Sequence, residues 1–269
     1  MTSTTDGAIE YSVFTKPWRD TPLDALGAMV RGMGFDGVEL PVRPGYQVEP
    51  GAVAQDLPKA ARTLAAEGVK IASVAGPTDE ATIVACAEAG VPIIRVCVNI
   101  PPGRSYLDHI AAVQAEYDRL LPLLDKHGVT IGVQNHNGRA VAHAMGMRHL
   151  IEKYNPAQVG AVYDPAHCGL DGEIPELALD IVWSHLRMVN LKNAYWLRTN
   201  GPEAEVAQHR VWWTSGEQGL TSWPKVVAEL RERGYRGTVC LPAEYSDEAQ
   251  VNRLIVRDLA FAKSLFAGA

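Results

Sequence analysis

The sequence predicts an α/β fold in which eight parallel strands alternate with helices, and three observations support that prediction. Short apolar runs recur along the 269 residues, and segments whose apolar residues have helical spacing separate them. The runs are nearly continuous in apolar residues, as expected of parallel strands that are covered on both faces. A glycine precedes several runs, where a helix would end. Eight such units in about 250 residues are typical of a (β/α)8 TIM barrel.

The apolar runs can be followed in order along the chain. The predicted strands cover residues 9–14, 37–40, 69–76, 91–100, 129–136, 159–163, 187–191 and 235–244. The first helix is predicted to begin with Thr21 as N-cap and Pro22 at its first position, and to end at Gly34. The last helix is predicted over residues 248–266 from its apolar spacing. Glycines that would end helices precede four of the strands, at Gly68, Gly90, Gly128 and Gly234.

No segment divides the chain, and we therefore expect a single domain over residues 1–269. A doubly wound sheet is the alternative, but no glycine-rich phosphate motif follows an early strand. The longest stretches that we predict to be irregular are residues 41–57 and 194–220. Both follow strands, so in a barrel they would lie on the face that carries active sites.

Composition and charge exclude several classes of protein. The chain is 47% hydrophobic and 21% charged, which is ordinary for a globular protein. Its net charge of −6 disfavours binding to nucleic acid or to an anionic membrane. No apolar run approaches the roughly 20 residues that cross a bilayer, and no leader is recognisable, so we expect a cytoplasmic protein. The four cysteines are widely spaced and are expected to be reduced.

Polar side chains close the last four predicted strands, at Gln134, Asp164, Asn190 and Glu244. In a barrel, these strand ends surround one mouth. A set of oxygen ligands with two carboxylates suits a hard divalent cation, Mg²⁺ or Mn²⁺. Taken alone, Asp164 could equally be the N-cap of a helix and Glu244 a loop acid. Their recurrence at neighbouring strand ends is what favours a shared site.

Further polar residues are expected to face the same mouth. Side chains two apart on a strand share a face, so His136 should accompany Gln134, and Lys192 should accompany Asn190. Glu39, at the end of the second strand, would face them from across the barrel. His136 could instead be a turn histidine.

The chain also carries motifs that resemble those of a known family. They are GFDGVEL (34–40), IGVQNHNG (131–138), VYDPAHCG (162–169), MVNLKN (188–193), RVWWTSGEQG (210–219) and GYRGTVCLPAEY (234–245). In order and spacing they resemble the xylose isomerase-like TIM barrels of the sugar phosphate isomerase/epimerase superfamily. The resemblance implies one divalent metal ion, Mn²⁺ or Mg²⁺, held by Gln134, Asp164, Asn190 and Glu244. It also implies that His167 and Arg210 hold oxygen atoms of the substrate, and that His136 and Glu39 line the substrate pocket.

Two residues depart from the pattern of that family. Gln134 stands where the family usually has glutamate, and Asn190 where it usually has histidine. A neutral metal site would bind its ion more weakly, because each lost charge-assisted contact is worth about 1.5–3 kcal/mol. Related epimerases use two glutamates as bases, but Gln134 cannot accept a proton. The base must then be Glu244, His136, Glu39 or Lys192.

The resemblance and these residues together predict a divalent-metal-dependent isomerase or epimerase that acts on a small sugar or keto-sugar through an enediolate, which the metal ion would stabilise. Glu244 or His136 would take the proton next to the carbonyl, and Lys192 or Arg210 would stabilise the negative charge. Trp18 could stack on the substrate or pack against the barrel.

Other functions remain open at this stage. One is a lyase or dehydratase that uses the same enediolate, for example in β-elimination from a 3-keto-glycoside, with or without a partner subunit. Another is a sugar-binding barrel without catalysis. We expect a sugar substrate and no nucleic-acid or membrane partner, and the sequence leaves a homo-oligomer open.

Overall fold

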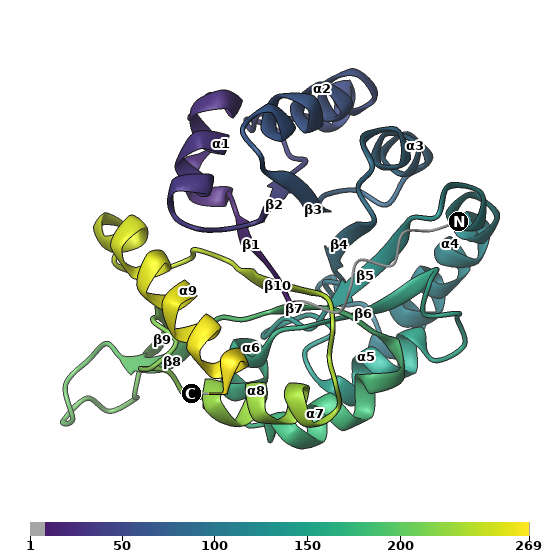
Figure 1. Cartoon of the computed structure of the whole chain (residues 1–269). Helices are drawn as coiled ribbons and strands as arrows, with labels where there is room; N and C mark the ends of the chain where they lie inside the picture. Colours follow the sequence, from purple (N-terminus) through teal and green to yellow (C-terminus); the bar gives the residue numbers. More distant parts are fainter. Residues whose placement is uncertain (1–8, 269) are drawn as a thin grey trace.

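The computed structural model describes residues 9–268, which form a closed barrel of parallel strands wrapped by helices (Figure 1). The barrel strands are β1 (Glu10–Phe14), β2 (Gly37–Pro41), β3 (Lys70–Ala75), β4 (Ile93–Cys97), β5 (Thr130–Gln134), β6 (Val159–Tyr163), β7 (Leu186–Asn190) and β10 (Thr238–Leu241). Neighbours in the chain are neighbours in the barrel, and β1 pairs with β10 to close it. The predicted fold, a single-domain α/β TIM barrel, is confirmed.

Helices cover the outside of the barrel in the order of the chain (Figure 1). They are α1 (Leu23–Gly32), α2 (Val53–Ala66), α3 (Glu80–Ala89), α4 (Tyr106–His127), α5 (Ala144–Ile151), α6 (Pro165–Leu170), α7 (Pro175–Val182), α8 (Trp223–Glu232) and α9 (Val251–Ala267). The five glycines predicted to end helices, Gly34 among them, all have a positive φ, between 64° and 92°. Within residues 9–268, no helix is long and apolar enough to span a membrane.

Two hydrophobic clusters lie on opposite faces of the barrel sheet. Neighbouring residues of one strand, such as Val13 and Phe14 of β1, belong to different clusters, because successive side chains point to opposite faces. The larger cluster joins the strands to the surrounding helices. The smaller one fills the barrel interior with one residue from each of six strands: Phe14, Ala75, Ile93, Val162, Met188 and Cys240. This packed interior closes the barrel below its C-terminal mouth.

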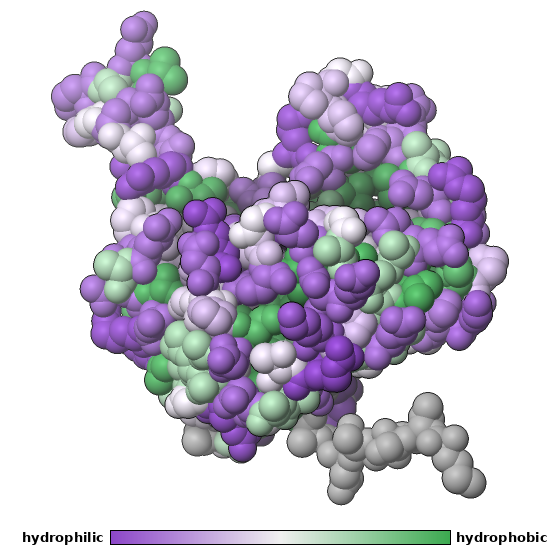
Figure 2. Space-filling view, turned by 90° about the horizontal axis from the view of Figure 1, so that it is seen from above, coloured by the Kyte–Doolittle hydropathy of each residue, from purple (hydrophilic) through white to green (hydrophobic). Residues whose placement is uncertain are grey.

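Three local expectations are corrected by the structure. Residues 194–220 contain the greater part of an antiparallel hairpin of β8 (Asn193–Arg198) and β9 (His209–Thr214), which projects from the barrel (Figures 1 and 2). The segment 41–57 ends in a short 3₁₀ turn, Pro50–Ala52, and the start of α2. Pro22 rather than Thr21 is the N-cap of α1, with an extended ψ of 145°. At the other end, the helix runs to Gly32, and Gly34 lies just past it with a φ of 92°, as predicted for a glycine that ends a helix.

Candidate functional site

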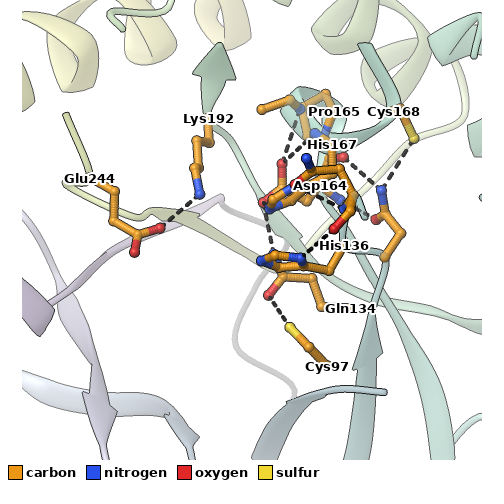
Figure 3. A network of polar contacts seen from close by, with 12 residues as sticks. Cys97, Gln134, His136, Asp164, Pro165, His167, Cys168, Lys192 and Glu244 are labelled. Carbon is orange, nitrogen blue, oxygen red and sulfur yellow. Dashed lines mark hydrogen bonds and ion pairs between the residues drawn. The ribbon is translucent and has the colours of Figure 1, made fainter. Parts of the chain in front are cut away.

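A cavity of about 310 Å³ lies at the C-terminal ends of the barrel strands. Six of the residues singled out from the sequence line it: Gln134, His136, His167, Asn190, Lys192 and Glu244. Figure 3 shows two groups of these side chains. Lys192 and Glu244 face each other on one side, and the histidines lie with Gln134 and Asp164 on the other. The barrel therefore brings together residues that are up to about 110 positions apart in the sequence.

Glu244 follows β10 and is held between two lysines. Its Oε2 is 2.7 Å from Nζ of Lys192, and its Oε1 is 2.5 Å from Nζ of Lys16. Burial alone would raise the pKa of Glu244, but the two ammonium groups, Lys192 first, hold it well below its usual range. The preceding residue, Ala243, has a φ of 52°, which is uncommon for a residue with a side chain. Glu244 is thus a charged, fully engaged acceptor and a weak base.

Lys192 occupies a central position among the charged groups. Its side chain is only 7% exposed, and its Nζ lies 3.6 Å from the ring centroid of Trp213 on β9. The Trp213 ring also meets the ring of His167 edge-on, with the centroids 5.3 Å apart. The hairpin therefore contributes an aromatic face that covers the ammonium group and partly excludes water from it.

His136 has an orientation that suits a general base. Its Nδ1 lies 3.0 Å from the backbone oxygen of Asn137. Because a carbonyl oxygen can only accept, Nδ1 carries the hydrogen and Nε2 keeps the free electron pair. Burial, assisted by the charge of Lys192, lowers the pKa of His136. The imidazole is therefore neutral at pH 7 and able to take a proton.

Asp164 follows β6 and has the role of a helix N-cap. Its Oδ1 accepts from the backbone nitrogens of Ala166 and His167 at 3.0 and 3.4 Å, at the start of α6. Its Oδ2 accepts from Nε2 of Gln134 at 2.8 Å. Burial raises the pKa of Asp164 to about 6, although Lys192 opposes that rise. The structural role that the sequence left open for Asp164 is thus present, and a binding role remains compatible with it.

His167 stacks beside His136, with the ring centroids 4.1 Å apart. Its Nδ1 contacts Asn137, whose backbone nitrogen is 3.2 Å away. Its Nε2 is buried, lies 3.6 Å from Oδ2 of Asp164, and has no hydrogen-bond partner among the described residues. Burial, and then the charge of Lys192, lowers the pKa of His167 well below its usual range. His167 is therefore neutral and leaves one nitrogen available to a ligand.

Three of the predicted contact residues lie elsewhere. Glu39 does not line the cavity: it is fully buried and bound by Arg95, with Oε2 2.6 Å from Nη2 and Oε1 3.0 Å from Nε. Arg210 is exposed on β9, where its guanidinium carbon lies 5.0 Å from the ring centroid of Trp212. Trp18 lines a second cavity of about 760 Å³, which shares Lys16 and Glu244 with the first.

Several residues of the site were not predicted from the sequence. Lys16, Arg43, Arg95 and Cys97 all line the cavity. Arg95 could have been recognised from the sequence, because it is the only charged residue in the apolar run 91–100. Asn135 was also missed. Its side chain accepts from the backbone nitrogen of Asp164 at 2.8 Å and donates to the backbone oxygen of Asp164 at 2.9 Å.

The predicted metal ligands do not have the arrangement that Mg²⁺ or Mn²⁺ requires. Gln134 turns its amide nitrogen toward Asp164, and both oxygens of Glu244 are bound by lysines. Asn190 offers a buried Oδ1 without a partner, but it is a single neutral ligand. Within residues 9–268, no group of three or more His, Cys, Asp or Glu side chains is placed to hold a metal ion. The donor set therefore fits a divalent cation poorly.

Metal analysis tests this conclusion directly. After incubation with excess Mn²⁺ and gel filtration, elemental mass spectrometry is expected to find far less than about one Mn per chain. The Asp164→Asn variant should give the same result as the unchanged protein. About one Mn per chain, lost in Asp164→Asn, would restore the four-ligand site.

Comparisons with known proteins agree with the fold. The solved structures that resemble it include a xylose isomerase domain protein from Planctomyces limnophilus, with 17% identity and a TM-score of 0.68, covering 97% of this chain and 96% of that one. A 3-keto-D-glucoside 4-epimerase from E. coli has 14% identity and a TM-score of 0.70, with 95% and 99% covered. A probable 3-DHS dehydratase from Bacillus anthracis has 13% identity and a TM-score of 0.72, with 94% and 98% covered.

These identities are low enough that the likeness to solved structures shows the fold alone. Comparison with curated proteins gives no significant sequence match. The family model of the xylose isomerase-like TIM barrels, in contrast, matches residues 28–265. The chain therefore belongs to the family of xylose isomerase-like TIM barrels.

Proposed function

We propose that the protein is an enzyme that moves a proton next to the carbonyl group of a small sugar or keto-sugar, as an isomerase or epimerase. One observation supports this most strongly: a neutral imidazole with a free Nε2, His136, lines the same cavity as a shielded ammonium group, Lys192. A base and a fixed positive charge are what the formation of an enediolate requires. The family includes sugar isomerases and epimerases, in agreement with a sugar-type substrate.

In the proposed reaction, Nε2 of His136 takes the proton from the carbon beside the carbonyl. The electron pair of that C–H bond forms the C=C bond of the enediolate, and the carbonyl oxygen gains the negative charge. Lys192, held in place by Glu244, stabilises this charge. Return of the proton to the neighbouring carbon isomerises the sugar, and return to the opposite face epimerises it.

Members of this family are typically metal-dependent, and the sequence predicted Mn²⁺ or Mg²⁺ here. Our proposal assigns no step to a metal ion, because the donor set fits one poorly. The positive charge that the oxyanion needs is supplied by the chain itself. Lys192, with Lys16 beside the same carboxylate, would be its source.

A lyase or dehydratase is the second candidate, and a specific observation favours it. Both oxygens of Glu244 are engaged by lysines, so His136 is left as the main base. Elimination needs one base and one acid, rather than two bases on opposite faces of the sugar. The neighbouring cavity of about 760 Å³, lined by Trp18 and Trp213 among others, has room for a leaving group. A partner subunit or second copy of the chain remains a prediction from the sequence.

Solvent exchange tests the proposal without knowledge of the natural substrate. In D₂O, the protein should exchange the hydrogen next to the carbonyl of at least one probe among D-fructose, D-psicose, D-tagatose and D-fructuronate, as followed by NMR. The rate should be high above the lowered pKa of His136 and fall as the pH drops through it, because only the neutral ring accepts a proton. The acid limb should thus lie below pH 6.5, the ordinary value for histidine.

The products separate the two candidates. New ketose or epimer signals support the isomerase or epimerase, and a released fragment supports the lyase. An acid limb above pH 6.5 would count against His136 as the base. Failure to exchange the hydrogen of any of the four probes would favour a binding protein.

A further inference from the structure

We propose that the substrate carries a carboxylate group, and that Arg43 binds this carboxylate in the cavity at the strand ends. The inference deepens the proposed function, and it rests on it only in taking this cavity as the substrate site. It restricts the expected class of substrates from sugars in general to sugar acids. Three observations carry it: the balance of charges, the environment of Arg43, and two unpartnered atoms opposite.

The charges around the cavity leave one cation uncompensated. Its lining includes four cationic side chains, Lys16, Arg43, Arg95 and Lys192. Arg95 is paired with Glu39, and the two lysines share Glu244. Asp164 is the third acid nearby, and its Oδ2 is bound by the neutral amide of Gln134. Four cations against three acids leave a single positive charge even when Asp164 is ionised.

Of the four cations that line the cavity, Arg43 is the one that has no carboxylate partner among residues 9–268. It follows β2, is half-buried, and makes no side-chain hydrogen bond or ion pair with the described residues. Its guanidinium carbon lies 5.5 Å from the ring centroid of Phe14, and that of Arg95 lies 4.7 Å from the same centroid. Phe14 thus supports Arg43 over the cavity. Because burying a cation without a counter-ion is costly, an anionic ligand at this place would be stabilised.

A carboxylate fits this place better than a phosphate monoester. One unpaired guanidinium matches one negative charge, and its fork matches two carboxylate oxygens. The backbone nitrogens at the start of α6 are already capped by Asp164, so they are not free to hold phosphate oxygens. Two other buried lining atoms, Oδ1 of Asn190 and Nε2 of His167, have no hydrogen-bond partner in the described part of the chain. They are available to the hydroxyl groups of the same ligand.

Binding of three probes tests the proposal by calorimetry, without turnover. D-Glucuronate should bind about 10-fold or more tightly than D-glucose, which has the same ring without the carboxylate, because charge-assisted contacts are worth this much. D-Glucose 6-phosphate should bind more weakly than D-glucuronate. Arg43→Gln should abolish the preference for D-glucuronate, whereas Arg43→Lys, which keeps the charge, should retain part of it. Arg62→Gln, which removes an exposed charge on α2, should change nothing.

The binding results test the carboxylate proposal independently of the proposed proton-transfer reaction. Equal binding of D-glucuronate and D-glucose to the unchanged protein would overturn it, as would a preference that survives Arg43→Gln. Tighter binding of D-glucose 6-phosphate would overturn the carboxylate in favour of phosphate. A thermal melt confirms that Arg43→Gln is folded, and Arg43→Lys decides the matter if it is not. A protein that selects D-glucuronate but exchanges no proton would keep this site and refute the proposed reaction.

Discussion

Replacing His136 with asparagine is expected to lower the rate of proton exchange by about 10²–10⁴-fold, the usual contribution of a general base. His136 has its Nε2 electron pair free, and Glu244 is held at low pKa by two lysines. Burial lowers the pKa of His167, the other imidazole that lines the cavity, well below its usual range, so it is expected to be the weaker base. The substitution should leave the fold intact, because the ring of His136 is half-buried and makes one hydrogen bond, to the Asn137 backbone. NMR in D₂O measures the rate of proton exchange, and a thermal melt shows whether the variant is folded.

His143→Asn is the matched control. His143 is exposed at the start of α5 and its side chain makes no capping hydrogen bond, so exchange should be unchanged. If His136→Asn exchanges as fast as the unchanged protein, the base lies elsewhere. Glu244→Gln would then be the next variant, and loss of exchange there would transfer the role to Glu244.

Glu39→Gln is expected to destabilise the protein by about 3–5 kcal/mol, the usual effect of breaking a buried ion pair. Glu39 is 0% exposed and Arg95 is 7% exposed, and the two are joined by two hydrogen bonds. Ser73 donates a third hydrogen bond to Oε1 of Glu39 at 3.0 Å. The neutral amide would leave the guanidinium of Arg95 buried without its counter-ion. Urea denaturation measures the free energy of unfolding.

A pair on the same barrel that is more exposed to water provides the control. Glu10 and Lys70 lie 2.7 Å apart with 23% and 59% of their side chains exposed. Glu10→Gln should cost no more than about 1 kcal/mol, because water screens such pairs. If Glu39→Gln lowers the free energy of unfolding by an equally small amount, water reaches Arg95 when its partner is removed. The pair would then contribute little to the stability of the barrel.

The barrel could be predicted because its signals are local and repeated. Apolar runs fixed the eight strands to within a few residues, and the glycines after helices carry the positive φ that their position required. The β8–β9 hairpin was missed for a physical reason. Its strands are rich in polar and aromatic residues, and ten residues, 199–208, separate them, so no short turn signal marks the hairpin.

The position of the site was easier to predict than its chemistry. Strand ends in a barrel converge whatever residues they carry, and Lys192 and Asn190 line the same cavity. The sequence does not show which partner each side chain takes. Lys16 reaches Glu244 across 228 residues, and Gln134 donates to Asp164 instead of offering its oxygen. Arg210 was assigned from resemblance alone, and Glu39 from its position at a strand end as well; Arg210 lies against Trp212, and Glu39 is paired with Arg95.

The amide of Asn135 has a consequence for the order in which the site forms. The side chain of Asn135 accepts a hydrogen bond from the backbone nitrogen of Asp164 and donates one to its backbone oxygen. These two bonds extend the hydrogen bonding between β5 and β6 past the ends of the two strands. Asn135 is 0% exposed, so water does not compete for these hydrogen bonds. The rim that carries Asp164 and His167 is thus built as part of the sheet. Its side chains are set in place when the barrel folds, before any ligand arrives.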